Sequence, residues 1–237
     1  MIHWLVCPAD ACPGLEDGAA PPGFLSTPER ETYAGLAYPK RRREWLLGRW
    51  TAKRLLRLSL ARYGELSLRA ITVGNDPDGA PFLSVDREGR LPVSLSISHR
   101  QDRAFCALSP SPAPPIGADI ERVEPRDPVF VHDFFTTGEA QLVQHCPPAA
   151  RDTLVTVMWS AKESVLKTLR LGLRADTRRV EIQDVGGIEP ASPESDGEGG
   201  WRQVQVQSTL PGATHLCAWW RRDGTYVLTL AAGSSQR

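Results

Sequence analysis

The sequence predicts an α+β fold of two similar subdomains, each with one long helix and a small, mainly antiparallel sheet. Two long segments, residues 40–63 and 151–171, place apolar side chains at helical spacing. Around each of them lie shorter apolar runs bounded by turn residues, which is typical of strands joined by hairpins. Between the two halves, residues 109–115 contain four prolines, a composition that cannot continue the interior of a sheet. We therefore expect an N-terminal subdomain at residues 1–113 and a C-terminal subdomain at 114–237.

The first half is expected to begin with a loop, because residues 8–28 are rich in proline, glycine and alanine. A short helix should start near Pro28 and break before Pro39, since a residue that precedes proline disfavours helical backbone. The long helix at 40–63 comes next. Strands are predicted after it at residues 68–73, 93–98 and 104–108.

The second half is expected to begin with a strand at residues 116–121. Two short helices, 128–135 and 137–144, should precede the long helix at 151–171. Four strands are predicted after that helix, and Asp223-Gly224 between the last two is a hairpin signal. These strands cover residues 180–185, 204–206, 216–220 and 226–230.

Residues 189–200 are acidic and rich in glycine, serine and proline, a composition that predicts a mobile excursion between strands. The two halves resemble each other in their order of elements. We find no residue-level repeat between them in the sequence.

Composition limits the class of function. With 28 basic and 28 acidic residues the formal net charge is zero, which gives no support for nucleic-acid binding. The five cysteines are odd in number and show no C-x-x-C spacing, so we expect free thiols in a reducing cytoplasm rather than a zinc site. The first apolar run has no cationic start and ends at Pro8, so no signal peptide is expected, and no stretch reaches membrane-spanning length.

Two short segments carry the chemistry. Asp119 and Glu121 are two residues apart on a predicted strand, so both carboxylates should point to the same face. Lys162, Glu163 and Lys167 fall within about a turn and a half of the second long helix. Three carboxylates and two ammonium groups could thus meet at one point. Such a set suits Mg²⁺ and a phosphate ester, because Mg²⁺ prefers carboxylate, water and phosphate oxygens.

Lysine is rare in this chain, and its placement supports that interpretation. There are 24 arginines but only four lysines, and two of the four fall in the helical segment just described. A retained lysine among arginines indicates a position that needs a compact point charge rather than a planar fork. The four are Lys40, Lys53, Lys162 and Lys167.

Together these motifs resemble the Sfp-type 4′-phosphopantetheinyl transferases, over roughly residues 40–230. The family pattern G-[IV]-D-[IV]-E is similar to residues 117–121, and [FW]-[SCT]-x-K-E-[SA]-x-x-K is matched by residues 159–167. Further features of the family occur in the same order along the chain. They are Leu47-Gly48 with Lys53, Ser98-His99, and Phe134-Phe135-Thr136 with Glu139.

The resemblance implies a monomer with two subdomains in pseudo-twofold arrangement. It implies transfer of the phosphopantetheine arm from coenzyme A to a serine of an apo acyl or peptidyl carrier protein. The reaction requires Mg²⁺ and releases adenosine 3′,5′-bisphosphate. Coenzyme A and the carrier protein are the expected partners, with no nucleic acid and no membrane. The sequence does not distinguish among fatty-acid, polyketide and non-ribosomal peptide carriers, nor between coenzyme A and acyl-coenzyme A.

The resemblance also assigns roles to residues. Asp119, Glu121 and Glu163 would surround Mg²⁺. Glu163 is the first candidate for the base that takes the proton of the serine hydroxyl, directly or through water, and Glu139 is the second. Coenzyme A is expected to contact Lys53, Ser98, His99, Arg100, Lys162 and Lys167. Lys167 is also predicted to be a catalytic residue.

The chain departs from the family pattern at two positions. Family members often have Gly-Lys-Pro before the second strand, whereas this chain has Ala80 in place of the lysine. One phosphate-binding lysine is therefore missing, and Arg100 is a candidate to replace it. Ala118 stands where a β-branched residue is usual, which should affect packing only.

Simpler interpretations remain open at this stage. Asp119 and Glu121 could be solvated carboxylates at a strand end, and Ser160 with Glu163 also fits a capping box that starts a helix. The basic run at residues 40–43 is either a solvated helix end or a docking surface for an acidic carrier protein. Two other functions are alternatives. One is a different metal-dependent phosphoesterase, and the other is a non-catalytic module that binds coenzyme A or a carrier protein.

Overall fold

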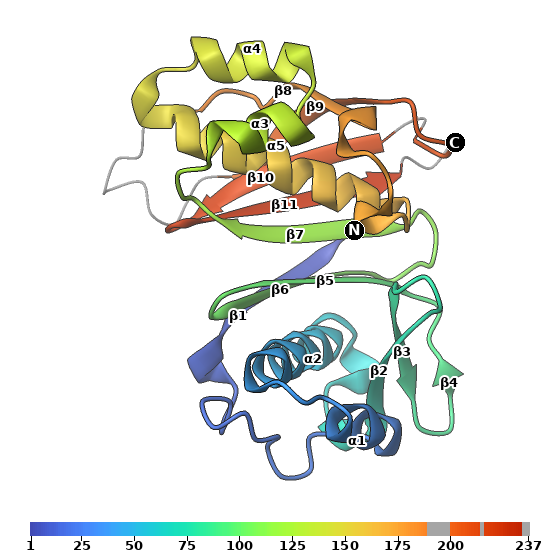
Figure 1. The fold of residues 1–237 in the computed structure, drawn as a ribbon. Helices are drawn as coiled ribbons and strands as arrows, with labels where there is room; N and C mark the ends of the chain where they lie inside the picture. Colours follow the sequence, from blue (N-terminus) through green and yellow to red (C-terminus); the bar gives the residue numbers. More distant parts are fainter. Residues whose placement is uncertain (189–199, 214–215, 234–237) are drawn as a thin grey trace. The chain divides into compact units, whose positions relative to one another are not determined.

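The computed structural model describes residues 1–188, 200–213 and 216–233. It divides into two compact units, Met1–Ala113 and Pro114–Arg237, and each is described below by itself (Figure 1). Helices and small antiparallel sheets occur in both, which confirms the predicted α+β class. The predicted excursion at 189–200 lies outside the described residues except for Gly200.

Unit 1 places the long helix α2 against the three-stranded antiparallel sheet β1-β6-β5, and a second sheet follows the order β2-β3-β4. Its helices are α1 (Thr27–Ala34) and α2 (Pro39–Ser59), with short 3-10 turns η1 (Ala9–Ala11), η2 (Ala61–Tyr63) and η3 (Leu68–Ala70). Its strands are β1 (His3–Pro8), β2 (Ile71–Asn75), β3 (Pro81–Val85), β4 (Gly89–Arg90), β5 (Ser94–Arg100) and β6 (Arg103–Ser109).

Unit 2 has one antiparallel sheet of five strands in the order β7-β11-β10-β9-β8, and the long helix α5 packs on β7 and β11 (Figure 1). Its helices are α3 (Pro128–Phe134), α4 (Thr137–His145) and α5 (Pro148–Thr168), with 3-10 turns η4 (Gly172–Arg174) and η5 (Thr177–Arg179). Its strands are β7 (Ile116–Arg122), β8 (Val180–Asp184), β9 (Arg202–Ser208), β10 (Leu216–Asp223) and β11 (Tyr226–Gly233).

Both long helices form where the apolar spacing predicts them, but each begins and ends earlier than expected. Each begins at a proline, Pro39 in α2 and Pro148 in α5, where the missing N–H costs no helical hydrogen bond. Ser160 lies well inside α5, so the alternative of a helix start at that residue is wrong. In the described part of the chain, no helix is both long enough and apolar enough to cross a membrane.

Three strands of unit 1 were not predicted. The edge strand β1 lies in the apolar N-terminal run, for which no strand was predicted. It pairs with β6, about a hundred residues away in sequence. Strand β3 begins with Pro81, a position that proline tolerates because it is the first of its strand. The short strand β4 pairs with β3 at Ser84 and Val85 only. The expected strand at 68–73 starts later, because η3 occupies its first residues.

The two units share a residue-level repeat that the sequence analysis missed. Residues 24–29 read F-L-S-T-P-E, and residues 134–139 read F-F-T-T-G-E. Further along each unit, W-T-A-K at 50–53 corresponds to W-S-A-K at 159–162 on the long helix. The repeat escapes a scan by eye because the two short matches stand about twenty residues apart. The earlier statement that no such repeat exists was therefore wrong.

In unit 2 this repeat builds a buried Lys–Glu pair. Both Lys162 and Glu139 are 0% exposed, and their Nζ and Oε2 atoms lie 2.8 Å apart. The ammonium also donates to the carbonyl oxygens of Thr177 (3.0 Å) and Val180 (2.5 Å). The carboxylate accepts from the backbone N–H of Ile182 at 2.7 Å, besides closing the capping box that starts α4.

Unit 1 contains the matching pair of Lys53 and Glu29. The ammonium donates to Glu29 and to the carbonyl oxygens of Phe24 (2.9 Å) and Leu68 (3.0 Å). The Glu29 carboxylate accepts from the backbone N–H of Val73 at 2.9 Å and closes the capping box at the start of α1. Val73 and Ile182 each stand third in their strand, so the repeat extends to the strand after the long helix.

Removing one member of such a pair should destabilise the fold strongly. In Glu139→Ala the Lys162 ammonium would stay buried without its counter-charge, and we expect unfolding to become easier by about 3–5 kcal/mol. Urea unfolding at neutral pH measures this loss. Glu181→Ala is the control, because Glu181 is half-buried and accepts from Thr136 of the same capping box at 2.8 Å. Its loss should not exceed about 1.5 kcal/mol, and equal losses in both variants would contradict the prediction.

Candidate active site

Asp119 is the centre of the candidate site. It lies on β7 opposite Thr229 of β11, and only 2% of its surface is exposed. Its Oδ1 accepts from the Lys167 ammonium at 2.7 Å, and its Oδ2 accepts from the Ser160 hydroxyl at 2.7 Å. Lys167 also donates to the carbonyl oxygen of Ala118 at 3.0 Å. Lys167 and Ser160 both come from α5, so the carboxylate ties this helix to the sheet.

The close approach of α5 to the sheet depends on Gly117. A Cβ atom at this position would lie 1.9 Å from the carbonyl oxygen of Ser164, well inside contact distance. Hydroxyls then bridge the helix and β11, as when Thr168 donates to the carbonyl oxygen of Ala231 at 3.1 Å. Small polar side chains therefore replace apolar packing along this seam, and they bring α5 near enough to reach Asp119.

Glu163 lies on α5 within the electrostatic reach of Asp119 and Glu121. Burial raises the pKa of Glu163, the two neighbouring carboxylates raise it further against the opposing effect of Lys167, and it reaches about 8. Burial disfavours the charged ammonium of Lys167, but Asp119 and Glu163 outweigh burial and raise its pKa. The cluster therefore holds more negative charge than its one lysine balances, and Glu163 keeps a proton at neutral pH.

Glu121 is held by an arginine that the sequence analysis did not single out. Arg126 places its Nη2 3.0 Å from Glu121 Oε2 and 3.7 Å from Glu124 Oε1. Its guanidinium also lies 5.1 Å from the centre of the ring of Phe130, a residue of α3. No motif marks Arg126, because its role follows from the path of the irregular segment between β7 and α3.

Sequence similarity identifies the family. Residues 115–230 match the family described as the 4′-phosphopantetheinyl transferase superfamily. A holo-[acyl-carrier-protein] synthase from Geobacillus kaustophilus is 31% identical over 118 residues, which cover 48% of this chain and 81% of that protein. The chain belongs to the 4′-phosphopantetheinyl transferase superfamily. The family predicted from the motifs is thereby confirmed.

Two other members of the superfamily give the extent of the similarity. A 4′-phosphopantetheinyl transferase from Bacillus subtilis is 28% identical over 143 residues. That match covers 59% of this chain and 60% of the relative, less than two thirds of its length. The crystal structure of a Bacillus anthracis holo-(acyl-carrier-protein) synthase in complex with CoA (3′,5′-ADP) is 28% identical. The structural match covers 45% of this chain and 91% of the Bacillus anthracis chain, with a TM-score of 0.39.

The three carboxylates predicted from the superfamily motifs fit a divalent cation chemically. Among the described residues, no group of three or more His, Cys, Asp or Glu side chains is already arranged around a common metal position. Asp119 is paired with Lys167, and Glu121 is paired with Arg126. Burial first and the two neighbouring carboxylates second raise the pKa of Glu163, and a cation would offset the effect of the carboxylates. The metal assignment remains a prediction.

Three residues that the superfamily motifs assigned to coenzyme A or to catalysis do not fit those roles. Lys53 and Lys162 are each 0% exposed, and each directs its three N–H bonds to acceptors of its own unit. Burial also lowers the pKa of both lysines, although their glutamate partners oppose this. Glu139 is equally buried and accepts three hydrogen bonds, so it cannot take a proton from a substrate hydroxyl. We assign all three to the scaffold.

The remaining predicted contacts lie in unit 1. Ser98, His99 and Arg100 end strand β5, opposite Phe105, Ala104 and Arg103 of β6. Ser98 is buried, whereas His99 and Arg100 are half-buried. Their roles remain predictions, because they stand on a different unit from Asp119.

Arg49 is a candidate that sequence analysis missed. It is 8% exposed on α2, donates to Asn75 Oδ1 at 3.1 Å, and stacks 3.6 Å from the centre of the Trp45 ring. Its buried Nε has no hydrogen-bond partner among the described residues. Burial lowers the pKa of Arg49 to about 10, against the opposing effect of Glu29. A buried guanidinium with spare donors is suited to an anionic ligand.

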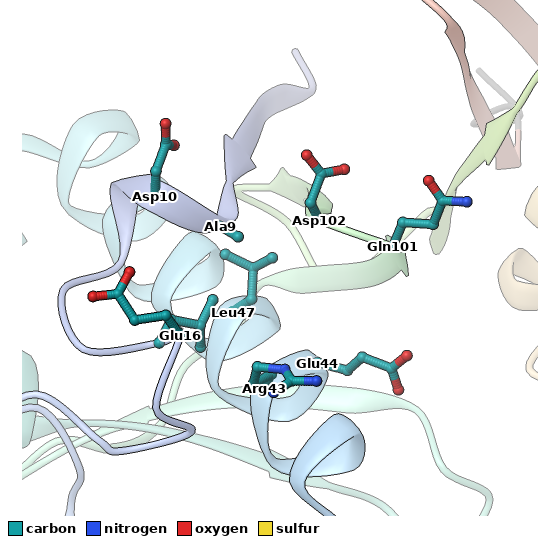
Figure 2. Close-up of a pocket in the computed structure, with 9 residues that line it drawn as sticks. Ala9, Asp10, Glu16, Arg43, Glu44, Leu47, Gln101 and Asp102 are labelled. Carbon is teal, nitrogen blue, oxygen red and sulfur yellow. The ribbon is translucent and has the colours of Figure 1, made fainter.

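Unit 1 also contains a cavity of about 360 Å³ that is unsuited to phosphate. Four carboxylates and only one arginine line it, and Figure 2 shows them around the side chain of Leu47. Anionic coenzyme A would be repelled by this lining, and none of the predicted site residues belongs to it. The lining consists of Ala9, Asp10, Leu15, Glu16, Arg43, Glu44, Leu47, Gln101 and Asp102.

The pKa of Glu163 predicts a pH dependence of stability. Folding raises this pKa from the ordinary 4.5 to about 8, so the folded state binds the proton more tightly than the unfolded state. The contribution is complete below about pH 4.5 and is lost as pH rises through about 8. In chelator, urea unfolding of the wild type should weaken across this window relative to Glu163→Gln. Glu65→Gln, at an exposed position, should follow the wild type, and parallel curves for Glu163→Gln would refute the prediction.

Proposed function

We propose that this protein transfers the 4′-phosphopantetheine group from coenzyme A to a serine of an apo acyl or peptidyl carrier protein, in a Mg²⁺-dependent reaction. The product besides the holo carrier is adenosine 3′,5′-bisphosphate. The cluster of Asp119, Glu163 and Lys167 is the observation that carries the proposal, since it lies within the part of the chain that matches the superfamily. Relatives named 4′-phosphopantetheinyl transferase and holo-[acyl-carrier-protein] synthase support it. We further propose a cytoplasmic monomer.

Lys167 supplies a cation that can meet a phosphate. Its side chain is 28% exposed, whereas the Asp119 carboxylate beneath it is 2% exposed. Two of the three N–H bonds of the ammonium are directed to Asp119 and to the carbonyl oxygen of Ala118, and the third is available to a phosphate oxygen. Asp119 thus holds Lys167 in place and keeps it charged. A fixed cation stabilises the charge that develops on the phosphoryl oxygens.

Glu163 is the proposed proton acceptor. A base works best when its pKa is near the working pH, and burial with two neighbouring carboxylates brings Glu163 to about 8. In its deprotonated form, which a bound cation would favour, Glu163 takes the proton of the carrier serine, directly or through a water molecule. Its oxygen bonds to the phosphorus of the phosphopantetheine arm as the bond from that phosphorus to the bridging oxygen breaks. The leaving group departs as adenosine 3′,5′-bisphosphate.

Asp119, Glu121 and Glu163 would hold the Mg²⁺ ion. The ion would supply positive charge to the pyrophosphate and to the leaving oxygen. Two cations of the chain already hold two of these carboxylates on β7, since Lys167 pairs with Asp119 and Arg126 pairs with Glu121. Repulsion among the three carboxylates supports the proposal, because it is relieved when a cation enters.

Arg49 is our proposal for the cation that replaces the missing lysine at Ala80. Asn75 links the two positions, since it accepts from Arg49 at 3.1 Å and donates to the carbonyl oxygen of Gly79 at 2.8 Å. The Arg49 guanidinium therefore lies beside the turn where the family pattern has its lysine. Arg49 therefore takes the place of Arg100 as the first candidate to replace the missing lysine. Ser98 and His99 remain proposed phosphate contacts.

The basic run at residues 40–43 is a weaker candidate for docking the carrier than its sequence indicates. Arg42 donates to the carbonyl oxygen of Leu36 and stacks over Tyr33, so it stabilises unit 1. Arg43 belongs to the lining of the acidic cavity. Lys40 and Arg41 are exposed and are the members of the run that remain available to a carrier.

Two alternative functions make different products. A metal-dependent phosphoesterase would release free phosphate or phosphopantetheine without modifying a carrier. A non-catalytic module would bind coenzyme A and leave it intact. The second is disfavoured because all acidic and lysine positions of the two main motifs are present.

The first prediction of this proposal is metal-dependent transfer. Mass spectrometry of an apo carrier incubated with the protein, coenzyme A and Mg²⁺ should show the addition of one phosphopantetheine. Asp119→Asn should abolish the addition, because the amide holds neither Lys167 nor the cation as the carboxylate does. Asp133→Asn, at an exposed position on α3, should retain full activity. Undiminished transfer in excess chelator would rule out the metal.

The second prediction concerns Arg49. Arg49→Met should weaken coenzyme A binding by about 1–3 kcal/mol, the usual range for hydrogen bonds to charged groups. Calorimetry measures the affinity, and urea unfolding confirms that the variant is folded. Arg41→Met, at an exposed position on the same helix, should bind as the wild type does. Wild-type affinity in Arg49→Met would remove Arg49 from the site.

A further inference from the structure

The hydroxyl of Ser160 is directed at Asp119 rather than at its own helix. Ser160 is 0% exposed in the interior of α5, and its Oγ lies 2.7 Å from Asp119 Oδ2. An ionised carboxylate can only accept a hydrogen bond, so the hydroxyl proton of Ser160 points to Asp119. Lys167 occupies the other oxygen of the same carboxylate. The two oxygens are thus held from two sides.

Two further buried hydroxyls lie behind Ser160. Thr229 Oγ1 is 2.9 Å from Ser160 Oγ, and Ser164 Oγ is 2.6 Å from Thr229 Oγ1; all three residues are 0% exposed. Because the Ser160 proton goes to Asp119, the Thr229 hydroxyl is free to donate to Ser160, at its Oγ or at its carbonyl oxygen 2.9 Å away. Ser164 then donates to Thr229. Ser160 is thus the member of this group of hydroxyls that bonds directly to Asp119, and Ser164 and Thr229 bond to each other behind it.

The internal repeat shows what this hydroxyl does when no carboxylate faces it. Thr51 of W-T-A-K takes the place of Ser160 in unit 1, and its hydroxyl donates to the carbonyl oxygen of Leu47, one turn back, at 2.8 Å. That bond is the ordinary one for a hydroxyl inside a helix. The strand position equivalent to Asp119 is Leu5, since Leu5 and Asp119 lie opposite the fourth residue of β6 and of β11. The presence of Asp119 therefore accounts for the direction of the Ser160 hydroxyl.

We propose that Ser160 is a positioning residue, whose hydroxyl fixes the Asp119 carboxylate for the divalent cation. This inference rests on the proposed function, because it concerns the same metal site. Ser160 and Lys167 hold different oxygens of the carboxylate, so together they fix its plane as well as its position. Ser160 restricts the carboxylate to one orientation and lowers the cost of ordering it when the ion enters. Its contribution is to metal affinity and not to the fold alone.

Ser164 offers a matched control. It is as buried as Ser160, lies one turn further along α5 and belongs to the same chain of hydroxyls, but it makes its bonds to Thr229 and not to Asp119. We would compare Ser160→Ala with Ser164→Ala by urea unfolding in chelator and by calorimetric titration of Mg²⁺ without coenzyme A. Both variants should lose similar stability. Only Ser160→Ala should weaken Mg²⁺ binding, by about 10-fold or more, as loss of a residue that orients a metal ligand does.

Ser160→Cys covers the case in which the alanine variant does not fold. It fills the space that alanine would leave empty and replaces the hydroxyl by a weak donor, so it should also bind Mg²⁺ less tightly than Ser164→Ala. Equal Mg²⁺ affinity in the Ser160 and Ser164 variants would overturn the proposal, and so would the absence of Mg²⁺ binding by the wild type. If the wild type binds Mg²⁺ as expected and the Ser160 variants lose it, but no carrier is modified, the positioning role stands and the proposed transferase function fails.

Discussion

Burial of a lysine ammonium beneath each long helix is the constraint on which the rest of the fold depends. Removing such a group from water costs several kcal/mol unless its charge is paired and its N–H bonds are all satisfied. In unit 2 this requires Glu139 from α4, the carbonyl oxygens of Thr177 and Val180, and α5 itself to meet at Lys162. The short helix, the long helix and the start of β8 are therefore brought together at one point. The pair formed by Lys53 and Glu29 meets the same requirement in unit 1.

The two units use this shared scaffold for different chemistry. In unit 2, Glu163 directly follows the lysine of the repeated Trp-x-Ala-Lys segment. The corresponding residue in unit 1 is Arg54. In the same way Lys167 corresponds to Leu58, which is exposed. In unit 1 the guanidinium of Arg54 lies 3.8 Å from the Cys7 thiol, whereas Glu163 faces two carboxylates. The acidic cluster is thus a property of unit 2, although both units present a long helix against a sheet.

Close packing of α5 on β7 and β11 turns that scaffold into a site. Gly117 removes the side chain that would keep the helix away, and hydroxyls fill the seam with directed hydrogen bonds. Directed bonds hold Asp119 more firmly than apolar contacts would, because each one fixes an angle as well as a distance. The same closeness buries Glu163 beside two carboxylates, and burial first and their charges second raise its pKa. Close packing of α5 on the sheet thus accounts both for the fixed position of Asp119 and for the raised pKa of Glu163.

The sequence by itself determined the elements whose signals are local. Helical spacing predicts α2 and α5, the alternation from Ile116 to Glu121 predicts β7 with both carboxylates on one face, and the motif at 159–167 identifies the family. Asp119 and Lys167, which were predicted to act together, lie in contact. These results follow because helix periodicity and strand alternation depend on neighbours a few residues away.

Only the tertiary structure decided which charged residues face a ligand and which are buried. Lys162 and Glu163 are neighbours in the same motif, yet α5 turns by about 100° per residue and sends them into different surroundings. Lys162 enters the core, and Glu163 joins Asp119. Strand β1, Arg49 and Arg126 were likewise missed, because their partners come from distant parts of the chain or from a turn. Burial and pairing depend on contacts between separated segments, and no local pattern of residues records those contacts.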